Sequence, residues 1–161
     1  MGLLPTKILV AVDTAVASEH ALDVAHELSD AIGAELHLVH VKVVSSSLRA
    51  PRSHVMTPEQ RALAEGEAKA VLDRMRERIE QRGGAIADTH VRYGQGIERE
   101  LVRAQEETGA ELLVVPARRA GSLPQRLAGG GSPVTPSGLV RRARGSLLVV
   151  HEPQETEPGS P

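Results

Sequence analysis

The stretch KILVAVDTAVASEHALDVAHELSDAIG, residues 7–33, contains the unit from which the fold of this chain can be predicted. Its first part, Lys7–Val12, is a short apolar run that ends at Asp13, as is typical of a buried strand. The segment Ser18–Ile32 follows with its apolar residues at helical spacing, Ser18 as the expected N-cap and Gly33 as a natural C-cap. The stretch therefore predicts a strand followed by an amphipathic helix.

The same alternation of strand and helix continues to residue 150. Short apolar or alternating runs predict four further strands, at Glu35–Val43, Ala85–Tyr93, Glu111–Val115 and Ser146–Val150. Amphipathic segments between them predict three more helices, which follow Thr57-Pro58, begin near Ile97 and follow Thr135-Pro136. Apolar strands joined by helices require a parallel sheet covered on both faces, so the fold class is a doubly wound α/β domain. We expect this single domain to span residues 1–151, and the polar, Pro-rich residues 152–161 to form a flexible tail.

Composition excludes several classes of partner and chemistry. The chain has 19 Lys and Arg against 21 Asp and Glu, a formal net charge of -2, so it offers no bulk electrostatic attraction for nucleic acid or an anionic membrane. The absence of cysteine excludes disulfides, thiolate metal sites and thiol catalysis, and it suits a reducing compartment. No run is long enough to span a membrane and no signal peptide is recognisable, so we expect a cytoplasmic protein.

A ligand crevice is expected where the carboxyl ends of two strands meet at a reversal of the winding direction. Asp13 follows the first strand, and Pro116 follows the strand at Glu111–Val115. The loop after Pro116 is rich in glycine and has no acidic residue; its three arginines, Arg118, Arg119 and Arg126, are candidates to contact an anion. The arginines at 141, 142 and 144 are instead explained by the end of a helix, where cations stabilise the dipole.

Sequence motifs for enzymatic chemistry are absent. The chain contains neither G-x-x-x-x-G-K-[ST] nor a G-x-G-x-x-G turn after the first strand. No histidine is placed by sequence to activate Ser18. His37 and His40 are three residues apart on a strand and point to opposite faces, so spacing indicates no metal site, and we expect the histidines at the surface or in an interface.

Four blocks of the chain resemble successive blocks of the universal stress protein family. These are KILVAVD, ALDVAHELSDAIGAELHLVHV, VRYGQGIERELVRAQEETGAELLVV, with Gly94 in its turn, and RRARGSLLVV. The resemblance implies a five-stranded sheet of order 3-2-1-4-5, with the reversal between strands one and four. It also implies a homodimer formed through the last strand, with Leu147, Leu148, Val149 and Val150 at the interface.

The resemblance further implies an ATP site. In the family, the nucleotide is bound by the end of strand one, here Val12 and Asp13, by backbone near Val41, and by a loop of pattern G-x-x-G-x(9)-G-[ST]. In this chain Pro116 and Arg119 stand at the first two glycine positions, and the third is Gly129, followed by Gly130. A Gly-Ser pair occurs two residues later, at Gly131-Ser132.

These departures change the chemistry expected of the loop. Proline fixes φ near -65° and removes an N–H, while Arg119 supplies charge in place of backbone amides, which favours a smaller or differently posed anion. Our first hypothesis is a non-enzymatic, homodimeric regulatory protein of the stress response, whose crevice takes a nucleotide or another small anion and whose protein partner is unknown. The alternatives are an ATP binder, with Mg²⁺, that uses Gly129, Gly131 and Ser132 in a shifted loop, and a weak ATPase.

Overall fold

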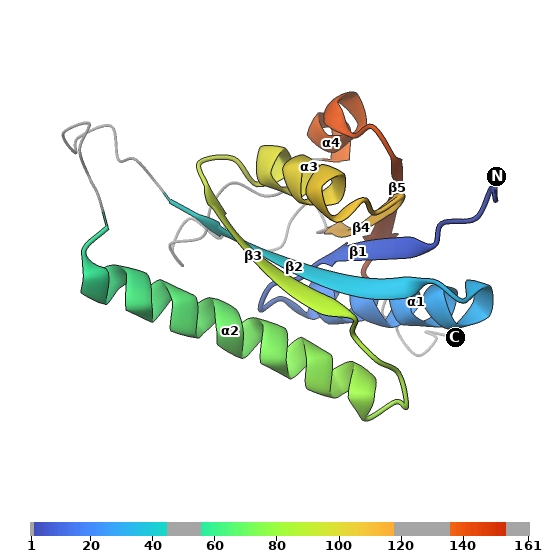
Figure 1. Ribbon diagram of the computed structural model, residues 1–161, viewed down its shortest axis with the longest axis horizontal. Helices are drawn as coiled ribbons and strands as arrows, with labels where there is room; N and C mark the ends of the chain where they lie inside the picture. Colours follow the sequence, from blue (N-terminus) through green and yellow to red (C-terminus); the bar gives the residue numbers. More distant parts are fainter. Residues whose placement is uncertain (1, 45–55, 118–135, 154–161) are drawn as a thin grey trace, which may run out of the picture.

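The computed structural model describes residues 2–44, 56–117 and 136–153. Within them, strands and helices alternate as the hydrophobic periodicity predicts (Figure 1). The strands are β1 Lys7–Ala11, β2 Glu35–Val43, β3 Asp88–Gly94, β4 Leu112–Ala117 and β5 Ser146–His151. The helices are α1 Val16–Ile32, α2 Pro58–Glu80, α3 Ile97–Thr108 and α4 Pro136–Arg142.

The five strands form one parallel sheet in the order β3-β2-β1-β4-β5, as expected. Helices α1 and α2 cover one face of this sheet, and α3 and α4 cover the other (Figure 1). The winding direction reverses between β1 and β4, because β1 pairs with β2 on one side and with β4 on the other. The carboxyl ends of these two strands are therefore adjacent.

Two aliphatic cores fill the space between the sheet and its helices. Alternate residues of β1 point to opposite faces, so Ile8 and Val10 join the core under α1 and α2, whereas Leu9 joins the core under α3 and α4. All three side chains are completely buried. Because the chain has no Trp or Phe, the side chains of Leu, Val, Ile, Ala and Met fill both cores by close packing.

The clearest differences from the predicted boundaries are at α1, β3 and β4. Helix α1 begins at Val16, two residues before Ser18. Strand β3 begins at Asp88, since the expected first residues, 85–87, lie outside the strand. Strand β4 continues through Pro116 to Ala117, beyond its last pair with β1, which joins Val10 to Val114. The missing N–H of Pro116 therefore interrupts no pairing with β1.

Three helix caps follow the sequence pattern. Thr57 and Gln60 form the expected capping box at the start of α2. Gly33 and Gly109 end α1 and α3 with φ of 70° and 68°, in the left-handed region that favours glycine.

The structure describes only the first two residues of the expected tail, 152–161, because its description ends at Pro153. The domain division at residue 151 therefore stays a prediction. None of the helices in the described ranges has the length and apolarity needed to cross a membrane.

Candidate functional site

The candidate crevice lies where β1 and β4 end side by side. Val10 pairs with Val114, so Val12 and Pro116 each lie two residues beyond the last pair of these strands. Val12 is buried, whereas Asp13 and Pro116 are half-buried. The structure thus brings the ends of the first and fourth strands together, as the sequence predicts.

Hydrogen bonds from neighbouring elements hold the backbone at Val12. The Val12 N–H donates to the carbonyl of Val39 over 2.9 Å. The Val12 carbonyl accepts from Nδ1 of His40 over 2.8 Å, and His40 is buried. Because a carbonyl can only accept, this bond places the His40 proton on Nδ1. His40 is therefore a positioning residue of the crevice that strand spacing did not reveal.

The turn at Asp13 is built around Ser18 and Ala15. The Asp13 N–H donates to the Ser18 hydroxyl over 2.8 Å. The same hydroxyl donates to the carbonyl of Ala11 over 3.4 Å. The Asp13 carboxylate accepts from the Ala15 N–H over 2.7 Å. The prediction that Ser18 is the N-cap is wrong, since Ala15 holds that position and Ser18 lies inside the helix. Asp13 accepts from the N–H of the N-cap residue itself, and no side chain caps the first turn of α1.

The other residues proposed for the nucleotide site divide into two groups. Val41 is half-buried and packs against the core under α3 and α4, and Pro116 pairs with Val150 of β5. The loop residues lie outside the described part of the chain; they are Arg118, Arg119, Arg126, Gly129, Gly131 and Ser132. Pro136 begins α4 as expected, and Arg141 and Arg142 lie in the last turn of that helix.

Three of the six histidines that the structure describes are buried, contrary to the surface or interface position expected for them. His26, His37 and His40 are buried and His90 is half-buried, while His151 is exposed. The expectation failed because each buried ring has a polar partner within reach: His26 lies 3.6 Å from the Asp30 carboxylate, and His37 lies 3.2 Å from Glu35. The prediction that His37 and His40 point to opposite faces is consistent with their different partners.

A cluster that spacing did not reveal forms between β2 and β3. One nitrogen of His37, one nitrogen of His90 and one oxygen of Asp88 lie within 4.8 Å of one another. His37 and Asp88 are register partners on neighbouring strands, which is why separation along the sequence gave no signal. Burial lowers the pKa of His90, against the opposing effect of the Asp88 carboxylate.

Strand β5 forms one edge of the sheet, with β4 as its neighbour. Leu147, Leu148 and Val149 are half-buried, and Val150 is buried. Leu148 packs against the core under α1 and α2, whereas Leu147 and Val149 pack against the opposite core. The apolar side chains of the expected interface therefore already contribute to both cores of the single chain.

A shallow cavity of about 260 Å³ lies between α1 and α2, away from the crevice; it is lined by Glu19, Arg74, Met75, Glu77, Arg78 and Gln81. Ion pairs cross it, among them Arg78 to Glu19 at 3.5 Å. The helices that form it carry none of the expected site residues, so we assign this cavity to helix packing.

The universal stress protein family model matches residues 5–151, which include every strand and helix of the fold. The chain belongs to the universal stress protein family. No curated protein sequence matches it significantly.

Solved universal stress proteins share this architecture. One from Burkholderia pseudomallei is 28% identical, with a TM-score of 0.66, and the match covers 93% of this chain and 98% of that one. A universal stress protein in complex with cAMP is 24% identical, with a TM-score of 0.60, over 91% of this chain and 97% of that one. One from Archaeoglobus fulgidus in complex with dAMP is 17% identical, with a TM-score of 0.57, over 90% and 97%. At these last two identities the likeness concerns the fold alone.

Proposed function

We propose that this chain is a non-enzymatic regulatory protein of the stress response that forms a homodimer and binds an adenine nucleotide in the crevice beyond β1 and β4. The observation that carries the proposal is the ordered turn at Val12 and Asp13. His40 fixes the Val12 carbonyl, and Ala15 and Ser18 fix Asp13 at the point where the sheet reverses. A site held in place before binding loses less entropy when the ligand arrives.

The preferred ligand is a nucleotide with one phosphate. The family motif has glycine where this chain has Pro116, and proline has no N–H to offer a phosphate. A loop altered at this position is better suited to the smaller charge of a monophosphate than to a triphosphate with Mg²⁺. Two solved universal stress proteins carry cAMP and dAMP, each with a single phosphate.

The nucleotide proposal is tested by thermal unfolding of the nucleotide-free chain with cAMP, AMP, ATP plus Mg²⁺, and inorganic phosphate. A ligand at about a hundred times its Kd stabilises the folded state by roughly 2.7 kcal/mol, which raises the unfolding temperature by several degrees. We expect cAMP or AMP to produce this shift and Asp13→Ala to abolish it. The control Asp73→Ala removes a carboxylate on α2 that pairs with Lys69, and it should keep the full shift.

The outcomes separate the candidate functions. If ATP with Mg²⁺ raises the unfolding temperature more than the monophosphates do, the result would favour the ATP binder, whose loop uses Gly129, Gly131 and Ser132. Release of phosphate from ATP that is lost in Asp13→Ala would favour the weak ATPase and contradict the non-enzymatic proposal. No shift with any nucleotide at millimolar concentration would contradict nucleotide binding and leave the dimer and its protein partner as the functional unit.

A further inference from the structure

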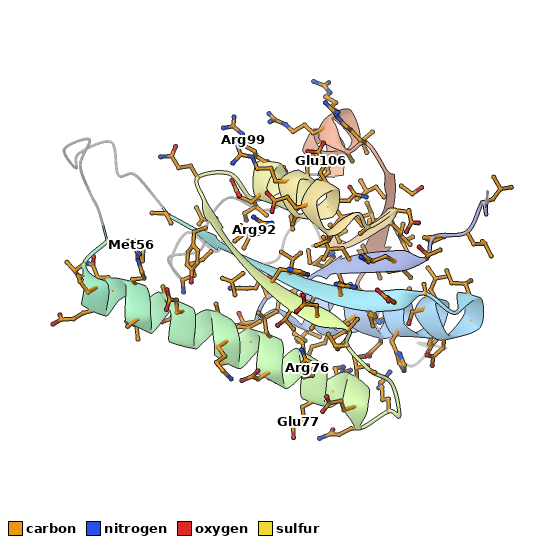
Figure 2. The ribbon with its side chains drawn as sticks, viewed as in Figure 1. Met56, Arg76, Glu77, Arg92, Arg99 and Glu106 are labelled. Atoms are coloured by element: carbon orange, nitrogen blue, oxygen red, sulfur yellow. The ribbon has the colours of Figure 1, made fainter. Side chains whose placement is uncertain are left out.

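The side chains of His37, Asp88 and His90 lie on the sheet face that α3 covers. His37 is the register partner of Leu9, and His90 is the register partner of Val39, and both of these apolar residues belong to the core on that face. Arg92, two residues after His90, marks the same face, because it pairs with Glu107 of α3 (Figure 2). The cluster lies near the start of β2, whereas the nucleotide crevice lies beyond the carboxyl ends of the strands.

The nitrogen atoms of the two imidazoles are spaced as ligands of one metal ion would be. Nδ1 of His37 lies 3.4 Å from Nε2 of His90. This distance exceeds the roughly 2.9–3.0 Å of an ordinary hydrogen bond from nitrogen. Two nitrogens bound tetrahedrally to Zn²⁺ with bonds of about 2.0–2.1 Å would be separated by about 3.3–3.4 Å. The observed spacing, which a long hydrogen bond between the near-parallel rings can also give, therefore matches that of two ligands of one ion.

Two carboxylates complete the arrangement around the imidazoles. Nε2 of His37 lies 3.2 Å from Glu35, so Glu35 can hold the proton on Nε2 and leave the Nδ1 lone pair facing His90. Metal-binding histidines commonly have such a carboxylate partner on the second nitrogen. Oδ1 of Asp88 accepts from the Thr89 N–H over 2.8 Å, which leaves Oδ2 3.9 Å from Nε2 of His90.

Burial and charge at the cluster also suit a cation. The side chains of His37 and His90 are 9% and 22% exposed, whereas those of Glu35 and Asp88 are 63% and 64% exposed. The nitrogens are thus partly desolvated, while the carboxylates form an open rim through which an ion can enter. Of the neighbouring cations, Lys7 donates to the carbonyl of Thr108, and Arg92 pairs with Glu107.

We infer that His37 Nδ1, His90 Nε2 and Asp88 Oδ2 form a binding site for a late first-row divalent cation, with Zn²⁺ the best match and Glu35 the positioning residue. Two imidazoles and a carboxylate are the ligand set that Zn²⁺ accepts, with water in the fourth position. The ion would join β2 to β3, the strand at the edge of the sheet. The proposal is independent of the nucleotide crevice and of its ligand.

The test is titration of the full chain with Zn²⁺ after removal of metal by chelation. We expect one Zn²⁺ to bind per chain, measured by calorimetry, with a rise of several degrees in the unfolding temperature. His90→Gln and Asp88→Asn should each weaken binding by about tenfold or more, and Glu35→Gln by about tenfold. The control His20→Gln changes a half-buried histidine on α1 and should leave affinity unchanged.

Co²⁺ provides a second measurement that does not depend on unfolding. Tetrahedral Co²⁺ absorbs visible light far more strongly than octahedral Co²⁺, so we expect intense bands in the wild-type chain and their loss in His90→Gln. Circular dichroism of the metal-free variants establishes that they fold. The proposal is overturned if the wild-type chain binds no stoichiometric Zn²⁺, or if folded His90→Gln binds it as tightly as the wild type.

Discussion

Asp23 on α1 has the most extensive ion pairing with α2 in the described ranges. Arg78 donates to its two carboxylate oxygens over 2.8 and 2.7 Å, and Arg82 lies 3.2 Å away. The side chain of Asp23 is 16% exposed. The hydrogen bonds from Arg78 lower the pKa of Asp23 below its ordinary value of 3.8, against the opposing effect of burial.

We predict that Asp23→Asn destabilises the protein at neutral pH and has little effect in acid. The folded-state pKa is depressed, so the stabilisation is fully present above the unfolded pKa and is lost as pH falls through the folded pKa. We expect a loss of about 1–2 kcal/mol at pH 7 that shrinks below pH ~4, measured by urea unfolding. Asp73→Asn, in an exposed pair with Lys69, should cost much less. An Asp23→Asn loss that persists undiminished in strong acid would contradict this account.

Gly94, at the end of β3, faces the buried side chain of Glu100. A Cβ at Gly94 would lie 2.5 Å from Cγ and 2.6 Å from Oε1 of Glu100. Arg103 holds that carboxylate over 3.3 Å, so it cannot move aside without losing a partner. We predict that Gly94→Ala lowers stability by about 1–3 kcal/mol in thermal or urea unfolding.

The matched control is Gly96→Ala, because no atom lies within 4 Å of a Cβ built there. Its φ of -138° is also accessible to alanine. Gly96→Ala should lower the free energy of unfolding by much less than Gly94→Ala does. When Gly94→Ala is combined with Glu100→Ala, part of the stability lost through Gly94→Ala should be recovered. Equal losses at both glycines would show that backbone freedom, rather than the contact with Glu100, explains Gly94.

At the scale of elements, α2 is held in two different ways along its length. Its later turns bury Leu72, Met75 and Ile79 against the sheet, and Arg76 donates to the carbonyl of Ile86 over 3.2 Å (Figure 2). Its first turn, residues 58–61, is exposed. The capping box of Thr57 and Gln60 is therefore the main stabilising contact of the first turn within the described residues.

We predict that Thr57→Ala frays the first turn of α2 while leaving the global unfolding temperature nearly unchanged. Loss of an N-cap costs about 1 kcal/mol, or about a fivefold rise in the local opening equilibrium. Hydrogen exchange at the Gln60 amide, which donates to the Thr57 hydroxyl over 3.2 Å, should accelerate accordingly. Thr57→Ser keeps the acceptor and should exchange as the wild type does. Unchanged exchange in Thr57→Ala would show that the cap does not limit opening.

At the scale of the whole molecule, the proposed homodimer would use β5, an edge of the sheet. An edge strand presents unpaired backbone groups that a second copy can cover. We predict that Val149→Lys converts the dimer to a monomer, measured by light scattering, because a charge would be buried in the interface. Val149 also packs against a core of its own chain, so circular dichroism must establish that the variant folds.

The control for this experiment is His151→Lys, at the exposed end of the same strand. It should keep the assembly of the wild type. A wild-type chain that is monomeric at micromolar concentration, or a folded Val149→Lys that remains dimeric, would refute an interface through β5.

The sequence by itself determined which segments become strands and helices. The signals that decide this, namely the periodicity of apolar residues, the N-caps and the glycine C-caps, each depend on residues close together in the chain. Thr57 with Gln60, and the glycines at 33 and 109, are local signals of this kind. The sheet order came from the family resemblance, since periodicity does not specify which strands are neighbours. The start of α1 was missed because Ser18, a residue type typical of N-caps, lies inside the helix, where its hydroxyl accepts from the Asp13 N–H.

Only the tertiary structure decided which distant side chains meet. His37 and His90 are 53 residues apart in sequence, and Asp23 and Arg78 are 55 apart. Strand register placed the first pair together, and the packing of α1 against α2 placed the second. His40 likewise reaches Val12 across 28 residues to support the crevice. Spacing along one strand carries no information about the side chain on the next, because register is fixed by how whole strands pack into the sheet.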